Sequence, residues 1–191
     1  MSEYRPDLRH RARRIQRSIR AAAIDQLTHE EVARSARTYP ITLLCPDWHD
    51  ARNVGAAFRL ADAAGLAGLV LSGSTPTPPH PKIARTARST VRAVPYEVIT
   101  DPLQYIETAR RQGKLILGLE ITSQSTSLFT YRLPHDREIL LLAGTESSGL
   151  SAPLLAACDA TVHLPMHGQN TSMNVAAALG AAVYLLLMQL Q

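Results

Sequence analysis

Three loops of the sequence carry polar residues at spacings that could hold a ligand or move a proton. The first loop, residues 47–59, contains Asn53, Gly55 and Arg59. Asn53 could cap a helix, and Gly55 could let an anion approach the free N–H groups at the start of that helix. Arg59 follows less than two helical turns later, so both side chains could lean toward overlapping regions. Taken alone, the loop is better explained by an ordinary cap and a surface arginine.

The second loop, residues 144–151, places a carboxylate between glycines. Gly144, Glu146 and Gly149 are followed by Leu150, at the position where a phosphate-binding loop needs its lysine. A nucleoside triphosphatase is therefore excluded, because the essential cation is missing. The glycines predict a backbone that curls round a ligand beside Glu146. The alternative is that Glu146 simply precedes a helix.

The third loop, residues 164–174, is rich in hydrogen-bonding groups and leads into a helix of mostly Ala and Leu. Ser172 is a suitable N-cap, and Asn174 falls within the first turn, where it could satisfy backbone groups. Each residue alone has a structural explanation. The functional hypothesis depends on the three loops meeting in space.

The elements between these loops alternate between apolar strands and helices. Strands are expected at residues 41–45, 68–71, 96–99, 115–119, 139–143 and 161–164, and helices at 53–64, 82–89, 102–112 and 172–189. Apolar strands separated by helices predict an α/β fold with a parallel sheet covered on both faces. Ligands of such sheets bind beyond the carboxyl ends of the strands, and the three loops fall there.

Residues 1–39 are expected to form a basic helical extension that precedes a main domain at 40–191. Asp7 could cap a helix that runs to about residue 24, and Thr28 with Glu31 matches a capping box that opens a second. Seven arginines lie between Arg5 and Arg20, with one acid, Asp7. Such a segment either binds a phosphate backbone or is a solvated helix face. RNA contacts are expected at Arg9, Arg13 and Arg17 of this segment and at Arg52 of the first loop.

The rest of the composition favours a cytoplasmic protein without a metal site. Cys45 and Cys158 lie far apart, so a disulfide framework or a zinc site is not expected. The arginine-rich N-terminus lacks the apolar region of a signal peptide. The longest apolar run, residues 175–188, is too short to span a bilayer.

Together, the three loops resemble the SpoU/TrmH family of RNA ribose methyltransferases in the SPOUT superfamily. The first resembles N-x-G-A-x-x-R through Asn53, Gly55, Ala56 and Arg59. The second resembles G-x-E-x-x-G-[LIM] through Gly144, Glu146, Gly149 and Leu150. The third resembles P-M-x-G-x-x-x-S-[LM]-N-V through Pro165, Met166, Gly168, Ser172, Met173, Asn174 and Val175. One such motif would be weak, whereas three in order are a specific signal.

The resemblance implies a C-terminal trefoil knot, a homodimer and S-adenosylmethionine as methyl donor. It assigns donor binding to six residues: Leu119, Gly144, Leu164, Met166, Ser172 and Met173. It assigns catalysis to Arg59, Asn53, Glu146 and Asn174, with Arg59 contacting the target nucleotide and assisting removal of the 2′-hydroxyl proton. The final helix carries Ala178, Ala181, Ala182, Leu185 and Leu186 at helical spacing, which fits either a dimer contact or the core.

Three other functions stay open at this point. A Rossmann dehydrogenase is disfavoured, because no G-x-G-x-x-G follows the early strands. A non-catalytic RNA-binding relative is disfavoured by the joint presence of all the motif residues. A structural dimer module has no positive indication. Transfer RNA and ribosomal RNA are both expected substrates, with a slight preference for transfer RNA because no separate RNA-binding domain is recognisable.

Overall fold

The computed structural model describes residues 26–28, 30–32, 37–134, 136–145 and 147–191. The chain divides into two units, residues 1–35 and 36–191. The expected first helix, with Arg9, Arg13 and Arg17, lies outside the described residues, and so does Glu146. In the first unit, the N–H and Oγ1 groups of Thr28 donate to Glu31 Oε2 over 2.7 and 2.8 Å. The described residues around this contact form a turn.

The second unit is built on a seven-stranded sheet in the order β3-β2-β1-β6-β4-β7-β5. Every neighbouring pair is parallel, which confirms the predicted α/β class. The strands are β1 (Tyr39–Pro46), β2 (Leu66–Ser72), β3 (Tyr96–Ile99), β4 (Leu115–Leu119), β5 (Thr126–Ser127), β6 (Ile139–Ala143) and β7 (Ala160–His163). All carboxyl ends therefore meet at one edge, called here the carboxyl edge.

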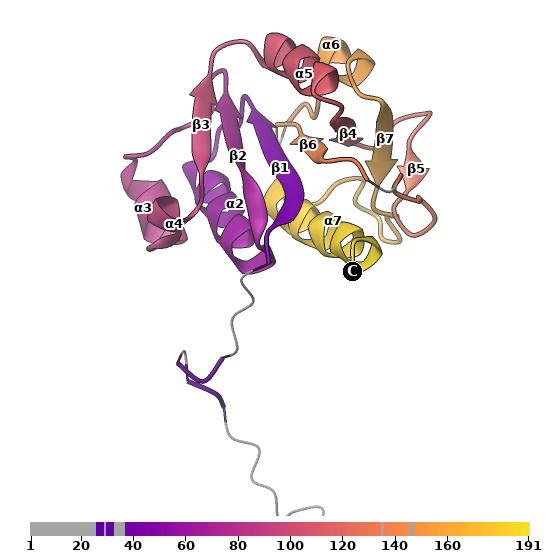
Figure 1. Cartoon of the computed structure of the whole chain (residues 1–191). Helices are drawn as coiled ribbons and strands as arrows, with labels where there is room; N and C mark the ends of the chain where they lie inside the picture. Colours follow the sequence, from indigo (N-terminus) through magenta and orange to yellow (C-terminus); the bar gives the residue numbers. More distant parts are fainter. Residues whose placement is uncertain (1–25, 29, 33–36, 135, 146) are drawn as a thin grey trace, which may run out of the picture. The chain divides into compact units, whose positions relative to one another are not determined.

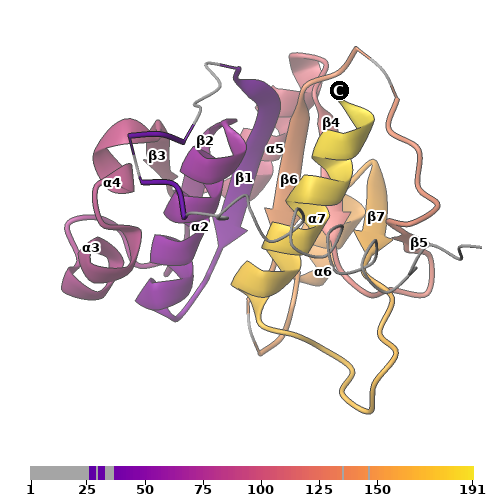
Figure 2. The same cartoon turned by 90° about the horizontal axis from the view of Figure 1, so that it is seen from below.

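Helices cover both faces of the sheet (Figures 1 and 2). They are α2 (Ala51–Ala64), α3 (Pro81–Ala87), α4 (Thr90–Ala93), α5 (Pro102–Arg111), α6 (Ala152–Ala156) and α7 (Val175–Gln189). The α2 and α7 helices pack together on one face, with α3 and α4 against α2, while α5 and α6 lie on the opposite face. No helix among the described residues is long and apolar enough to cross a bilayer.

Neighbouring residues of the central strands bury their side chains in two different cores. Leu43 belongs to the core shared with Phe58 of α2, whereas Leu44 belongs to the core shared with Ile106 of α5. Because successive side chains of a strand point to opposite faces, both must be apolar when both faces are covered. This explains the apolar run of residues 43–45 in β1 and the unbroken apolar run of β6.

Two predicted helix starts were wrong, because another residue caps the helix. In α2 the cap is Asp50, whose Oδ1 accepts from the backbone N–H of Arg52 over 2.9 Å, so Asn53 lies inside the first turn. In α7 the cap is Asn174 rather than Ser172. The helix expected at 82–89 corresponds to α3, which ends at Ala87, and the short α4 from Thr90 was not predicted.

Gly55 serves helix packing, not the approach of an anion. A Cβ atom on Gly55 would lie 2.7 Å from Thr86 Cβ and 3.0 Å from the carbonyl oxygen of Ile83, both in α3. Such a contact is too short, so the glycine lets α3 lie directly on α2. The motif glycine therefore fixes the position of α3.

The apolar stripe expected on the last helix divides between three environments. Ala182 and Leu186 are buried in the core beside α2. Ala178 lines the cavity described below, and Ala181 and Leu185 line a neighbouring groove. Only the last two are free to serve a dimer contact.

Candidate functional site

Trp48 connects the first loop to the end of β6, where the second loop begins. Its ring is fully buried, and Nε1 donates to the carbonyl oxygen of Ala143 at the end of β6 over 2.9 Å. Its backbone N–H donates to Thr75 Oγ1 over 2.9 Å, and that hydroxyl donates to the carbonyl of Cys45 over 2.8 Å. The ends of β1, β2 and β6 are thereby held in fixed relation. The sequence analysis missed both Trp48 and Thr75.

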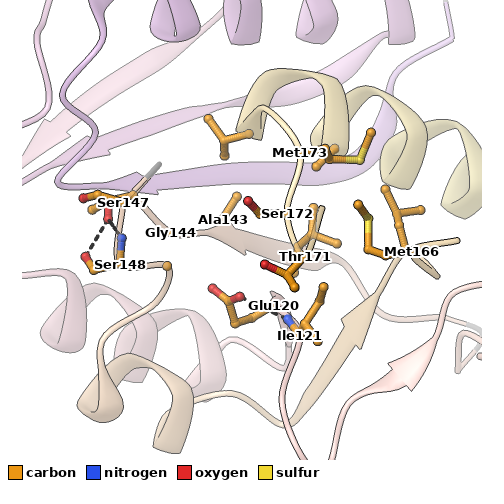
Figure 3. Close-up of a pocket in the computed structure, with 16 residues that line it drawn as sticks. Glu120, Ile121, Ala143, Gly144, Ser147, Ser148, Met166, Thr171, Ser172 and Met173 are labelled. Atoms are coloured by element: carbon orange, nitrogen blue, oxygen red, sulfur yellow. Dashed lines mark hydrogen bonds between the residues drawn. The ribbon is translucent and has the colours of Figure 1, made fainter. Parts of the chain in front are cut away.

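A cavity of about 380 Å³ opens at the carboxyl edge, where β4, β6 and β7 end (Figure 3). Its described lining residues come from the end of β4 and the residues after it, the end of β6 and the loop after it, the segment between β7 and α7, and the start of α7. All six residues assigned to donor binding line it: Leu119, Gly144, Leu164, Met166, Ser172 and Met173. The second and third loops therefore meet at one site.

The cavity has apolar walls with hydroxyls and one carboxylate among them. Ile121, Val175 and the two methionines supply apolar surface, and Thr171 and Ser172 supply hydroxyls. Glu120 carries the only charged side chain among the described lining residues. Figure 3 shows Glu120, Thr171 and Ser172 gathered around the same space. A ligand with a flat apolar part, several polar atoms and a positive charge would match this lining.

Glu120 also holds the second loop in place. Its Oε2 accepts from the backbone N–H of Leu150 over 2.9 Å, and its Oε1 accepts from that of Ile121 over 3.0 Å. Gly149, at φ 66°, lies directly against it, since a Cβ there would be 2.2 Å from Oε2. The sequence analysis missed Glu120. An acidic residue directly after a buried strand, at the carboxyl edge, was the available signal.

Gly144 is needed where the second loop turns back on itself. The N–H groups of Thr145 and Gly149 donate to each other's carbonyl oxygens, each over 3.1 Å. A Cβ on Gly144 would lie 2.0 Å from the carbonyl carbon of Gly149, so no side chain fits. The backbone of this loop thus forms one wall of the cavity.

Asn53 and Asn174 come together beside the cavity. Nδ2 of Asn174 donates to Oδ1 of Asn53 over 3.1 Å, and Asn53 is only 7% exposed. Asn174 stands between Met173 and Val175, which both line the cavity. Arg59 is exposed on α2, its side chain makes no hydrogen bond or ion pair with any described residue, and it does not line this cavity. The structure thus pairs two of the four residues assigned to catalysis.

The SpoU rRNA Methylase family matches residues 40–184 of the chain. The chain belongs to this family. The match includes all three motif loops and the cavity at the carboxyl edge. The resemblance inferred from the motifs is confirmed.

Relatives and solved structures agree with this assignment. The 23S rRNA (guanosine(2553)-2′-O)-methyltransferase RlmP of Bacillus subtilis is 29% identical over 163 residues, which are 85% of this chain and 62% of that protein. The SpoU methyltransferase AviRb of Streptomyces viridochromogenes, solved with AdoMet, superimposes with a TM-score of 0.70 at 28% identity. That match covers 81% of this chain and 59% of AviRb. The chain thus spans about three fifths of the length of these relatives.

A further solved structure matches over almost its whole length. It is described as giving insights into 2-OH methylation on tRNA, and it superimposes with a TM-score of 0.69 at 27% identity. The match covers 78% of this chain and 95% of that one. A solved chain of this fold can therefore be about as short as this chain's second unit.

Arg52, assigned to RNA contact, forms an ion pair at the start of α2. Its guanidinium contacts the Asp50 carboxylate over 2.7 to 3.0 Å, while its side chain stays 72% exposed. The hydrogen bonds from Arg52 hold the pKa of Asp50 below its usual value. Arg52 therefore stabilises the helix start of this SpoU chain, with part of its guanidinium still open to solvent.

An apolar groove of about 580 Å³ adjoins the cavity and shares Leu164, Met166 and Met173 with it. Tyr184 and Met188 of α7 border the groove and are 51% and 71% exposed. Large apolar side chains exposed together mark a contact surface.

Among the described residues, no group of three or more His, Cys, Asp or Glu side chains could hold a metal ion.

Proposed function

We propose that this chain is an RNA methyltransferase that transfers a methyl group from S-adenosylmethionine to a ribose 2′-hydroxyl. The observation that carries the proposal is the single cavity that gathers all six residues assigned to donor binding. The names of the relatives add to it, since they describe 2′-O-methyltransferases. An AdoMet-bound structure of similar fold supports the choice of donor.

The lining of the cavity fits this donor. A volume of about 380 Å³ lies in the range of sites for small molecules and cofactors. Leu119, Leu164 and Met166 suit an adenine ring, while the hydroxyls and the loop backbone offer hydrogen bonds. Glu120 supplies a charge opposite to that of the ligand. When bound, S-adenosylmethionine supplies a methyl group on a positively charged sulfur.

Methyl transfer requires that the acceptor hydroxyl be aligned with the donor methyl group and that its proton be lost, which here passes to solvent water. We assign alignment to the Asn53–Asn174 pair, which lies at the margin of the cavity, and to Glu146. Arg59 is exposed, and a solvated guanidinium stays protonated, so it serves as an anchor for the phosphate of the target nucleotide.

The proposal includes a homodimer, the C-terminal trefoil knot and action in the cytoplasm. The exposed apolar groove beside α7 supports the dimer, because Tyr184 and Met188 would be covered by a second copy. Sedimentation tests it: Tyr184→Glu with Met188→Glu should convert a dimer into a folded monomer. A monomeric wild-type protein would remove the dimer from the proposal.

The RNA substrate is ribosomal or transfer RNA. The preference for transfer RNA that the compact chain suggested gains no support, since the relatives' names are mainly those of ribosomal RNA enzymes. Mapping the ribose methylations lost from total RNA when the protein is removed would identify the substrate and its nucleotide.

Calorimetry with S-adenosylmethionine, followed by methyl transfer to total RNA, tests the activity. Saturable donor binding and ribose methylation are expected. Ser172→Trp is the control, because Ser172 is exposed and lines the cavity, so a bulky side chain should block the donor without disturbing the core. A wild-type protein that binds no donor would refute the proposal.

A further inference from the structure

Positive charge accumulates in the first motif loop and in the segment that follows it. Residues 51–95 contain six cations and only one acid, Asp62. We call these cations the basic face: Arg52, Arg59, Lys82, Arg85, Arg88 and Arg92. All six belong to α2, α3, α4 or the turn between α3 and α4, and all six are exposed.

The fold brings together the three helices that carry these cations. Arg52 and Arg59 are seven residues apart and so lie on the same side of α2, about 10 Å along its axis. The α3 helix lies directly on α2 through Gly55, and α4 packs on α2 as well. Lys82 is close enough to Asp50 to lower the pKa of that carboxyl, which places it near Arg52. Figures 1 and 2 show α3 and α4 beside α2 in both views.

The cations of the basic face differ from those elsewhere in their partners. Near α5 and α6, Arg110 pairs with Asp159 over 3.4 Å, Lys114 with Glu138 over 3.0 Å, and Arg137 with Asp159 over 3.4 Å. On the basic face, Arg52 is the only described cation with an ion pair. The other five cations are exposed and form no ion pair with any described residue. Such a surface repels itself unless an anion covers it.

We propose that the basic face binds the sugar–phosphate backbone of the RNA on either side of the target nucleotide. This inference rests on the proposed function. Five of its six cations are arginines, which bind phosphate through two parallel hydrogen bonds. The face begins at the first turn of α2, next to Asn53, and continues over α3 and α4. An RNA strand that presents its ribose near Asn53 and Arg59 would therefore meet the remaining cations.

The test compares two double variants with the same loss of charge. Arg85→Gln with Arg92→Gln removes two cations of the basic face, whereas Arg111→Gln with Lys114→Gln removes two paired cations elsewhere. Filter binding of unfractionated transfer RNA is measured over a range of salt. Loss of two phosphate contacts should reduce the slope of log affinity against log salt by about 2, with affinity down on the order of tenfold at low salt. The control should keep the wild-type slope.

Three further results would overturn the proposal. The first is a slope of log affinity against log salt that is unchanged in the Arg85/Arg92 variant. The second is a slope that falls as much in the Arg111/Lys114 control as in that variant. The third is tighter binding of the wild-type protein to phosphatidylserine vesicles than to RNA. Calorimetry with S-adenosylmethionine separates the two proposals, since neither variant should change donor affinity. A wild-type protein that binds no donor but shows the expected slope change would refute the methyltransferase and retain the RNA surface.

Discussion

Asn174 joins the first and third motif loops through one amide pair, across 121 positions of sequence. Its Oδ1 accepts from the backbone N–H groups of Ala176 and Ala177 over 3.0 and 3.2 Å. That orientation leaves Nδ2 to donate to Oδ1 of Asn53. The residue that caps α7 therefore also fixes the side chain of Asn53 in α2. Motif residues that each have a structural explanation alone form one unit here.

Asn174→Asp separates the two tasks of this residue. An aspartate still caps α7, but it loses the donor and sets a carboxylate against Oδ1 of Asn53. We expect the free energy of unfolding to stay within about 1 kcal/mol of wild type, while methyl transfer falls by at least about tenfold. Asn174→Ala should lose the cap as well, at a further cost of about 1 kcal/mol. Urea unfolding and single-turnover transfer measure both effects, and an Asp variant with wild-type transfer would remove the pair from the site.

Glu120→Gln tests the two hydrogen bonds by which the Glu120 carboxylate holds the backbone of Leu150 and Ile121. The amide keeps one acceptor, but it loses the charge that strengthens both backbone hydrogen bonds and faces the donor. We expect donor affinity to fall roughly tenfold, which corresponds to about 1.4 kcal/mol. Gly149→Ala should act in the same direction, because its methyl group would collide with Glu120.

Calorimetry with S-adenosylmethionine gives the affinities of the Glu120 and Gly149 variants. Glu107→Gln is the matched control, since this carboxylate lies exposed on α5, away from the cavity. Equal donor affinity in Glu120→Gln and wild type would show that the charge of Glu120 and its hydrogen bonds do not contribute to donor binding.

The sheet could be predicted from the sequence wherever a strand is buried on both faces. The bounds of β4 and β6 match the prediction, because apolar runs end there at a glycine or a charged residue. The first residue of a helix was harder to predict. Several residues near each helix start could serve as its N-cap, and tertiary contacts decide which of them does. The two residues of β5 and the five of α6 are too short to show a period.

The site was predictable where a motif is local, and not where it depends on distant partners. The convergence of the second and third loops followed from the motifs. Trp48 and Glu120 act through backbone groups 95 and 30 residues away, which no local pattern reveals. Of the basic face, Arg52 and Arg59 were assigned to RNA from the sequence, whereas the four cations of residues 82–92 were not, because only the packing of α3 and α4 on α2 brings their helices beside α2.

Arg59→Ala should reduce methyl transfer without affecting the fold. Arg59 is exposed and has no ion pair among the described residues, so its loss should change stability by no more than about 0.5 kcal/mol. If Arg59 anchors a phosphate, single-turnover transfer should fall on the order of a hundredfold, and Arg59→Lys should recover part of it. Arg111→Ala is the control. A rate near wild type for Arg59→Ala would exclude Arg59 from the reaction.

Asp50 makes the stability of α2 depend on pH. Hydrogen bonds from Arg52 lower the pKa of this carboxyl in the folded protein. A lowered pKa contributes stability that is fully present above the unfolded value, about 3.9, and is lost as the pH falls through the folded value. Asp50→Ala should therefore cost about 1 kcal/mol at neutral pH, where the cap and its charge are both lost.

The difference in unfolding free energy between wild type and Asp50→Ala should shrink only below about pH 4. Asp50→Asn keeps a capping oxygen that does not titrate, so its stability should depend less on pH in this range. Urea unfolding of the three proteins over the acid range measures the effect. A difference that already shrinks between about pH 7 and pH 5 would contradict this explanation, because Asp50 should be fully ionised there.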